Sequence, residues 1–194
     1  MIQRYSKEVG EVAVAWNSFH FLLQCIFCAL VERENMAPGV AIWNAIKADA
    51  LQRDLLVALA KTRLTSNSRL FKNIIWVTAQ ATELAKFRND AIHMPVETPE
   101  VSRDVVPWHI ARPASMERVT KHGYKKLFRT LVGDLNQLYV YSVYLNEVLA
   151  GRGNELASLR RPLLRCSQLF QEKSRKSGPR RQKPRRRRQP NASP

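Results

Sequence analysis

Apolar residues recur every three or four positions along most of the first 150 residues, which is the spacing of amphipathic helices. The pattern predicts four helices, over residues 6–31, 40–59, 73–93 and 123–150. Alternation of apolar and polar residues, the signature of a strand, never extends beyond about five positions. Residues 1–150 are therefore expected to form one all-α domain, an antiparallel four-helix bundle.

Two further segments lack this regular pattern. Residues 95–120 contain four prolines and are expected to form a long irregular loop, and loops of this length in a compact domain are often functional. Residues 151–172 are expected to add a short helical extension that is broken at Pro162. Residues 173–194 offer no apolar residue before Ala192, so they are expected to form a disordered tail.

Charge is concentrated at the C-terminal end. Residues 1–159 carry 19 Lys and Arg against 15 Asp and Glu, whereas residues 160–194 carry 13 against 1. Such a polycation predicts a polyanionic partner, with RNA or another nucleic acid favoured over an anionic membrane. The expected contacts in the tail are Arg180, Arg181, Arg185, Arg186, Arg187 and Arg188.

The first predicted helix contains a run, residues 12–31, that carries no formal charge and is long enough to cross a membrane. Polar residues such as Asn17 interrupt the run and its apolar residues keep a three-four repeat, which favours packing against other helices over a membrane span. Cys25 and Cys28 have C-x-x-C spacing, but no second Cys/His pair accompanies them. They are interpreted as core residues of a cytoplasmic protein, and no metal or cofactor is expected.

Reactive residues interrupt the apolar pattern near the end of the third predicted helix. The apolar stripe continues from Leu84 to Arg88 and Ala91, so a guanidinium occupies a position where an apolar side chain is expected. Burying that charge costs several kcal/mol unless a partner or a ligand compensates it. His93 follows in or beside the last helical turn. A purely structural interpretation is also open, because the helix dipole favours a histidine there and a carboxylate such as Asp134 could pair with Arg88.

Arg88 and Asn89, followed by three residues and His93, resemble the R-x4-6-H signature of the HEPN superfamily. The predicted setting is similar too, with the motif near the end of the third main helix. The resemblance implies a metal-independent endoribonuclease in which two copies of the motif meet across a homodimer interface. Arg88 and His93 would then be catalytic and Asn89 would support them. It also implies a toxin- or defence-related role, with an antitoxin-like protein as a further partner.

The residue types suit RNA cleavage without a metal. An imidazole that titrates near neutrality can accept the proton of a 2′-hydroxyl, and a guanidinium can stabilise the charge that develops on the phosphate. On one helix, however, Arg88 and His93 lie about 140° apart. A frayed helix end or a second subunit must therefore bring them together, which makes dimerisation part of the hypothesis.

Other candidates concern binding rather than catalysis. Trp108 and Arg112, in the long loop, are expected to contact nucleic acid, although Trp108 could equally pin the loop to the helices. His20, one turn after Trp16, is interpreted as a histidine on the flank of its helix. The alternative function is a non-catalytic nucleic-acid-binding or adaptor protein that acts through its basic tail.

Overall fold

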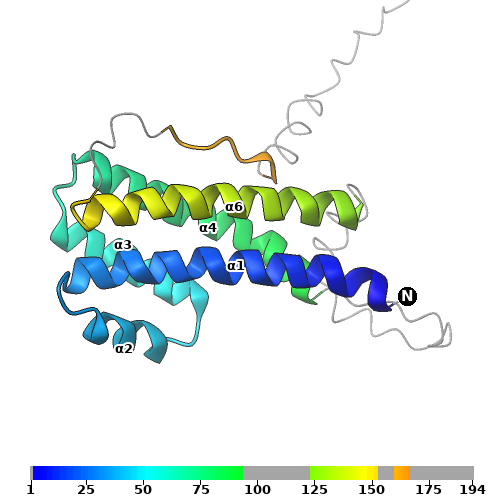
Figure 1. Ribbon diagram of the computed structural model, residues 1–194, viewed down its shortest axis with the longest axis horizontal. Coiled ribbons are helices and arrows are strands. Elements are labelled where there is room, and N and C mark those ends of the chain that lie inside the picture. Colours follow the sequence, from blue (N-terminus) through cyan, green and yellow to red (C-terminus); the bar gives the residue numbers. More distant parts are fainter. Residues whose placement is uncertain (1, 94–122, 153–159, 167–194) are drawn as a thin grey trace, which may run out of the picture.

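The computed structural model describes residues 2–93, 123–152 and 160–166, and these residues form helices without any strand (Figure 1). The all-α class is therefore confirmed for this part of the chain. The helices are α1 (Ile2–Val31), α2 (Ala37–Ala45), α3 (Asp49–Arg63), α4 (Arg69–His93) and α6 (Tyr124–Leu149). The predictions for the long loop and the basic tail lie outside the described residues.

The second predicted helix is wrong as a single element, because α2 ends and α3 begins with a break between them. The backbone is extended at Ile46, with φ −86° and ψ 115°, and at Ala48, with φ −107° and ψ 120°. Nε2 of Gln52 donates to the carbonyl oxygens of Trp43 and Ile46, each at 3.0 Å, and so satisfies acceptors at the end of α2. The apolar spacing runs through the break, which is why the sequence pattern did not reveal it.

This break also determines the direction of the helices. After α1, the segment that contains α2 leads the chain back toward the beginning of α1. α3 therefore runs in the same direction as α1. At the far end, Arg63 donates to the carbonyl oxygen of Val31 at 3.1 Å, and Arg33 donates to that of Ala150. The C-terminal ends of α1, α3 and α6 therefore meet, and α4 runs opposite to them (Figure 1). The fully antiparallel order expected from the sequence is wrong for this reason.

The hydrophobic core lies around α1, which packs most extensively against α6 and also touches α2, α3 and α4. Its buried face is the stripe that the three-four spacing predicts, and the same spacing supplies the buried residues of α6. The largest fully buried side chains include Trp16, Phe19, Leu23, Ile26, Phe128, Leu131 and Leu135. By length and composition, Ser6–Val31 also meets the criterion for a membrane span. Half of the most apolar 18-residue stretch of this segment is buried inside the fold.

Two polar side chains fix the ends of helices. Oγ of Ser68 accepts the backbone N–H of Phe71 at 3.2 Å, as expected of a helix cap at the start of α4. Asp134, buried on α6, accepts the backbone N–H groups of Arg165 at 3.0 Å and Cys166 at 2.7 Å. Its carboxylate therefore holds residues 160–166 against α6, where a helical turn begins.

α2 approaches α1 closely at Gly39. A Cβ atom there would lie 2.8 Å from Cα and 2.9 Å from Sγ of Cys28, a fully buried core residue as the sequence predicts. Cys25 is only partly buried, and burial raises the pKa of both thiols. Only a residue without a side chain fits between these two helices.

Gly39→Ala is accordingly expected to lower the free energy of unfolding by about 1–3 kcal/mol, because its methyl group must displace the backbone of α1. Gly10→Ala is the matched control, since nothing lies within 4 Å of a Cβ at that position and alanine favours the helix. Urea unfolding of both variants checks the prediction. Equal stability of the two variants would contradict the close contact.

Candidate functional site

Arg88 lies where α4 meets α1 and α3, and its side chain is 25% exposed. Nη2 is 3.6 Å from Oδ2 of Asp49, the first residue of α3, and Nη1 donates to Oδ1 of Asn89 at 3.0 Å. The guanidinium carbon lies 5.5 Å from the ring centroid of Trp16 on α1. The charge on the apolar stripe is thus paired with Asp49 and packed on an aromatic ring, and the suggested partner Asp134 is wrong because that carboxylate caps another segment.

A second guanidinium lies on the same indole. Arg53 of α3 is 4% exposed, and its guanidinium carbon is 5.8 Å from the ring centroid of Trp16. Its Nε donates to Oγ1 of Thr82 on α4 at 3.2 Å, and burial lowers its pKa. Nε1 of Trp16 donates to Oδ2 of Asp49 at 3.1 Å, so one carboxylate serves both the indole and Arg88.

His20 is more enclosed than a flank position implies. Its ring stacks on Trp16, with centroids 5.7 Å apart and planes 20° apart, and lies 5.6 Å from the ring of Trp43 on α2. Burial lowers the pKa of His20 to about 4; Asp49 opposes this shift, whereas Arg53 and Arg88 add to it. The imidazole is therefore neutral at pH 7.

We call Trp16, His20, Asp49, Arg53 and Arg88 the arginine–tryptophan cluster. It holds two permanent positive charges and one carboxylate, and the carboxylate of Asp54, next to Arg53 in the chain, also acts on the Arg53 guanidinium. Three of its buried nitrogen atoms have no hydrogen-bond partner within the described part of the chain: Nε2 of His20, Nη1 of Arg53 and Nε of Arg88.

These features suit an anionic acceptor such as a phosphate, which guanidinium groups bind through charge-assisted hydrogen bonds. A phosphate between the two guanidinium groups would offset their charge and raise the pKa of His20 toward the range of a general base. The cluster thus combines two anion-binding groups with a neutral imidazole.

The other two residues of the motif are exposed. His93 is the last residue of α4, which remains helical up to that point, so no frayed end turns His93 toward Arg88. The two residues are separated by about 140° around the helix and by about 7.5 Å along its axis. Asn89 contacts Arg88 and does not link it to His93.

The structure thus brings Arg88 to His20 and Arg53 rather than to His93. Sequence reasoning overlooked Arg53 altogether and interpreted His20 as a flank residue. The available signal was the spacing of one helical turn between Trp16 and His20 within the uncharged run of residues 12–31. Trp108, Arg112 and the arginines of the tail lie outside the described residues, so their contacts with nucleic acid stay predictions.

Comparison with protein families, curated proteins and solved structures gives no match to this chain. The resemblance to the HEPN superfamily therefore rests on the motif and its helical setting alone.

Proposed function

We propose that the protein is a metal-independent endoribonuclease in which Arg88 binds the phosphate that is cleaved. One observation carries the proposal: Arg88 keeps a buried, unpartnered Nε beside a second guanidinium and a neutral imidazole. A phosphodiester supplies the missing acceptors. In this proposal the helices form a HEPN-like domain, with α1, α3, α4 and α6 as its four main helices.

Cleavage needs a base that removes the proton of the 2′-hydroxyl, so that the oxygen attacks phosphorus and forms a 2′,3′-cyclic phosphate, while the bond to the 5′-oxygen breaks and that oxygen takes a proton from water. Two histidines can take this role. The resemblance implies His93, which would act with Arg88 of a second copy because it is turned away from Arg88 of its own chain. His20 lies beside Arg88 in the same chain, and a bound phosphate would raise its pKa.

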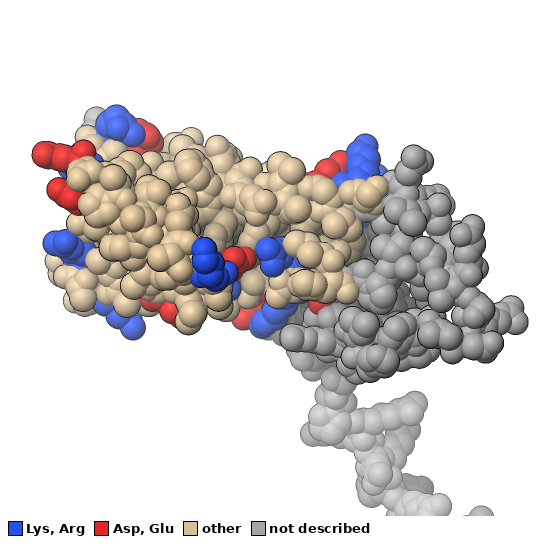
Figure 2. Space-filling model, turned by 90° about the horizontal axis from the view of Figure 1, so that it is seen from below, with Lys and Arg blue, Asp and Glu red and all other residues tan. Residues whose placement is uncertain are grey.

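A homodimer belongs to the proposal. Val14 and Phe21 on α1 are 67% and 60% exposed, and Val140 and Tyr144 on α6 are also exposed. Uncharged residues cover most of the face of the molecule seen in Figure 2. Exposed apolar side chains such as these four favour association, and association would allow one copy's His93 to approach the other copy's Arg88.

The second candidate function is the non-catalytic nucleic-acid-binding or adaptor protein. It is favoured by the ion pair between Arg88 and Asp49 and by the separation of His93 from Arg88. The basic tail, residues 173–194, which carries 10 Lys and Arg and no Asp or Glu, would then perform the binding.

The test is cleavage of a labelled single-stranded RNA in EDTA by full-length protein. Arg88→Ala and His93→Ala are assayed separately and after mixing, with His20→Phe as a third variant. If the site is shared between subunits, each of the first two variants is inactive alone. Mixing them forms heterodimers with one intact site and restores about a quarter of the wild-type rate.

Each outcome distinguishes the candidates. Restoration on mixing supports the shared site with His93 as the base. Loss of cleavage in His20→Phe but not in His93→Ala assigns the base to His20 within one chain. Absence of cleavage by wild type, together with tight RNA binding that disappears when residues 173–194 are deleted, overturns the nuclease in favour of the binding protein.

A further inference from the structure

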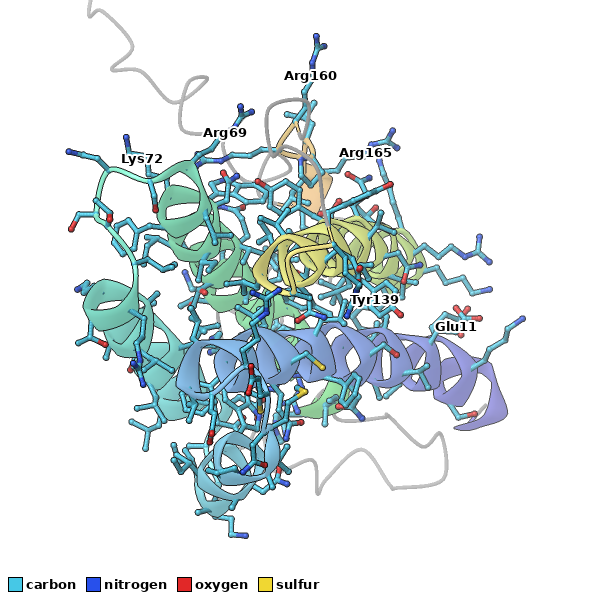
Figure 3. All side chains as sticks on the ribbon, turned by 60° about the vertical axis from the view of Figure 1, so that its left-hand side comes forward. Glu11, Arg69, Lys72, Tyr139, Arg160 and Arg165 are labelled. Atoms are coloured by element: carbon cyan, nitrogen blue, oxygen red, sulfur yellow. The ribbon has the colours of Figure 1, made fainter. Side chains whose placement is uncertain are left out.

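A second group of cationic side chains surrounds a hollow at the beginning of α4. The hollow has a volume of about 420 Å³ and is lined by Arg69, Lys72, Asn73, Arg160 and Arg161. Asn73 and Arg88 are 15 residues apart on α4, which places the hollow about 22 Å along the helix from the arginine–tryptophan cluster. Figure 3 shows Arg69, Lys72 and Arg160 extending on the same side of the molecule. Four of the five lining residues are cationic and none is acidic.

Arg161 is held in place by three contacts. Its guanidinium carbon lies 5.4 Å from the ring centroid of Trp76, and that ring packs edge-on against Tyr141, with centroids 5.1 Å apart. Nη2 donates to the carbonyl oxygen of Lys72 at 3.1 Å, and Nε and Nη2 both donate to Oδ1 of Asn73 at 3.3 Å. A guanidinium fixed in this way loses little side-chain entropy when it binds a ligand.

Asn73 provides the observation that points to a ligand. The residue is 4% exposed, and its Oδ1 is occupied by Arg161, so the orientation of the amide is fixed. Its Nδ2 is buried without a hydrogen-bond partner within the described residues. Leaving a buried donor unsatisfied is costly, and an acceptor placed in the hollow that Asn73 lines removes this cost.

We propose that this hollow binds a phosphate group, with Nδ2 of Asn73 and the side chains of Arg69, Lys72, Arg160 and Arg161 as its donors. A phosphate matches the site because it is an anion with several acceptor oxygens, and because forked guanidinium groups bind it in a defined geometry. The start of α4 adds the positive end of a helix dipole. The volume exceeds that of phosphate alone and is typical of sites that hold a larger ligand, so a nucleotide or a nucleic-acid backbone can carry the group.

Asn73→Asp is the sharpest test. The new carboxylate keeps an acceptor for Arg161, so the segment stays in place, but it replaces the buried donor with a negative charge that repels phosphate. Calorimetric titration of the full-length protein with sodium phosphate and with adenosine 5′-monophosphate is combined with fluorescence anisotropy of a labelled ten-nucleotide RNA. We expect binding of at least one of these probes to weaken by about tenfold or more in Asn73→Asp.

Asn136→Asp is the matched control, because it makes the same charge change at an exposed position of α6, and it should alter binding by no more than about twofold. Lys72→Gln combined with Arg160→Gln, both at exposed positions, provides a second variant that should weaken binding without unfolding the protein. If the site variants bind inorganic phosphate and the mononucleotide more weakly than wild type, the ligand is a small molecule. If only the binding of RNA is weakened, the ligand is the backbone of a nucleic acid.

The proposal is overturned if the wild type and Asn73→Asp bind all three probes equally, or if wild type binds none of them. It is also overturned if Asn136→Asp causes the same loss as Asn73→Asp. These readouts require no RNA cleavage, so the phosphate site and the proposed nuclease can fail independently.

Discussion

Arg88→Ala is expected to reduce metal-independent RNA cleavage by about 10²–10³-fold, the usual effect of removing a donor that stabilises charge in the transition state. The variant should remain folded. The ion pair with Asp49 joins side chains that are 25% and 37% exposed, and pairs of this kind contribute at most about 1 kcal/mol. The measurement is the initial rate of RNA cleavage in EDTA, accompanied by urea unfolding of the same preparation.

Arg88→Lys separates the charge from the shape of the side chain. It keeps the positive charge but lacks the planar fork that packs on Trp16 and offers several donors, so cleavage should stay about tenfold or more below wild type. Lys86→Ala, two residues away and paired with Glu83 at the surface, is the control and should retain the wild-type rate. Equal rates for wild type and Arg88→Ala would remove Arg88 from the mechanism.

Acidification is expected to destabilise the protein by about 3 kcal/mol through His20 alone. Burial lowers the pKa of His20 from 6.5 to about 4 in the folded protein. Between these two pKa values the unfolded chain binds a proton that the folded protein does not. Stability is therefore lost as the pH falls from about 6.5 toward 4, and below that range this residue causes no further change.

Urea unfolding between pH 7.5 and pH 4, measured on wild type and on His20→Phe, isolates this effect. The carboxylates titrate in both proteins, so their contribution cancels in the difference between the two free energies of unfolding. In His20→Phe the phenylalanine ring can still pack on Trp16 but does not titrate. The free energy of unfolding of this variant should therefore rise relative to that of wild type as the pH falls. His93→Gln, at an exposed position, should follow the wild-type dependence. A pH dependence that is the same in wild type and His20→Phe would contradict the enclosed, neutral imidazole.

The sequence by itself determined the all-helical class, most of the bounds of α1, α4 and α6, and the anomaly at Arg88. These are local properties. The three-four spacing of apolar residues follows from the pitch of a single helix, and a charge on the buried stripe is visible without knowing what lies opposite. For the same reason the spacing predicts most of the buried stripe on α1.

Only the tertiary structure decided what each side chain meets. The break between α2 and α3 depends on Gln52 binding carbonyl groups across it, and it changes the direction of α3. The partner of Arg88 is Asp49, 39 positions earlier, rather than Asp134. The hollow at the start of α4 joins Asn73 to Arg161, 88 positions later. Such contacts depend on how the helices are placed against one another, and the periodicity of one helix does not specify that placement.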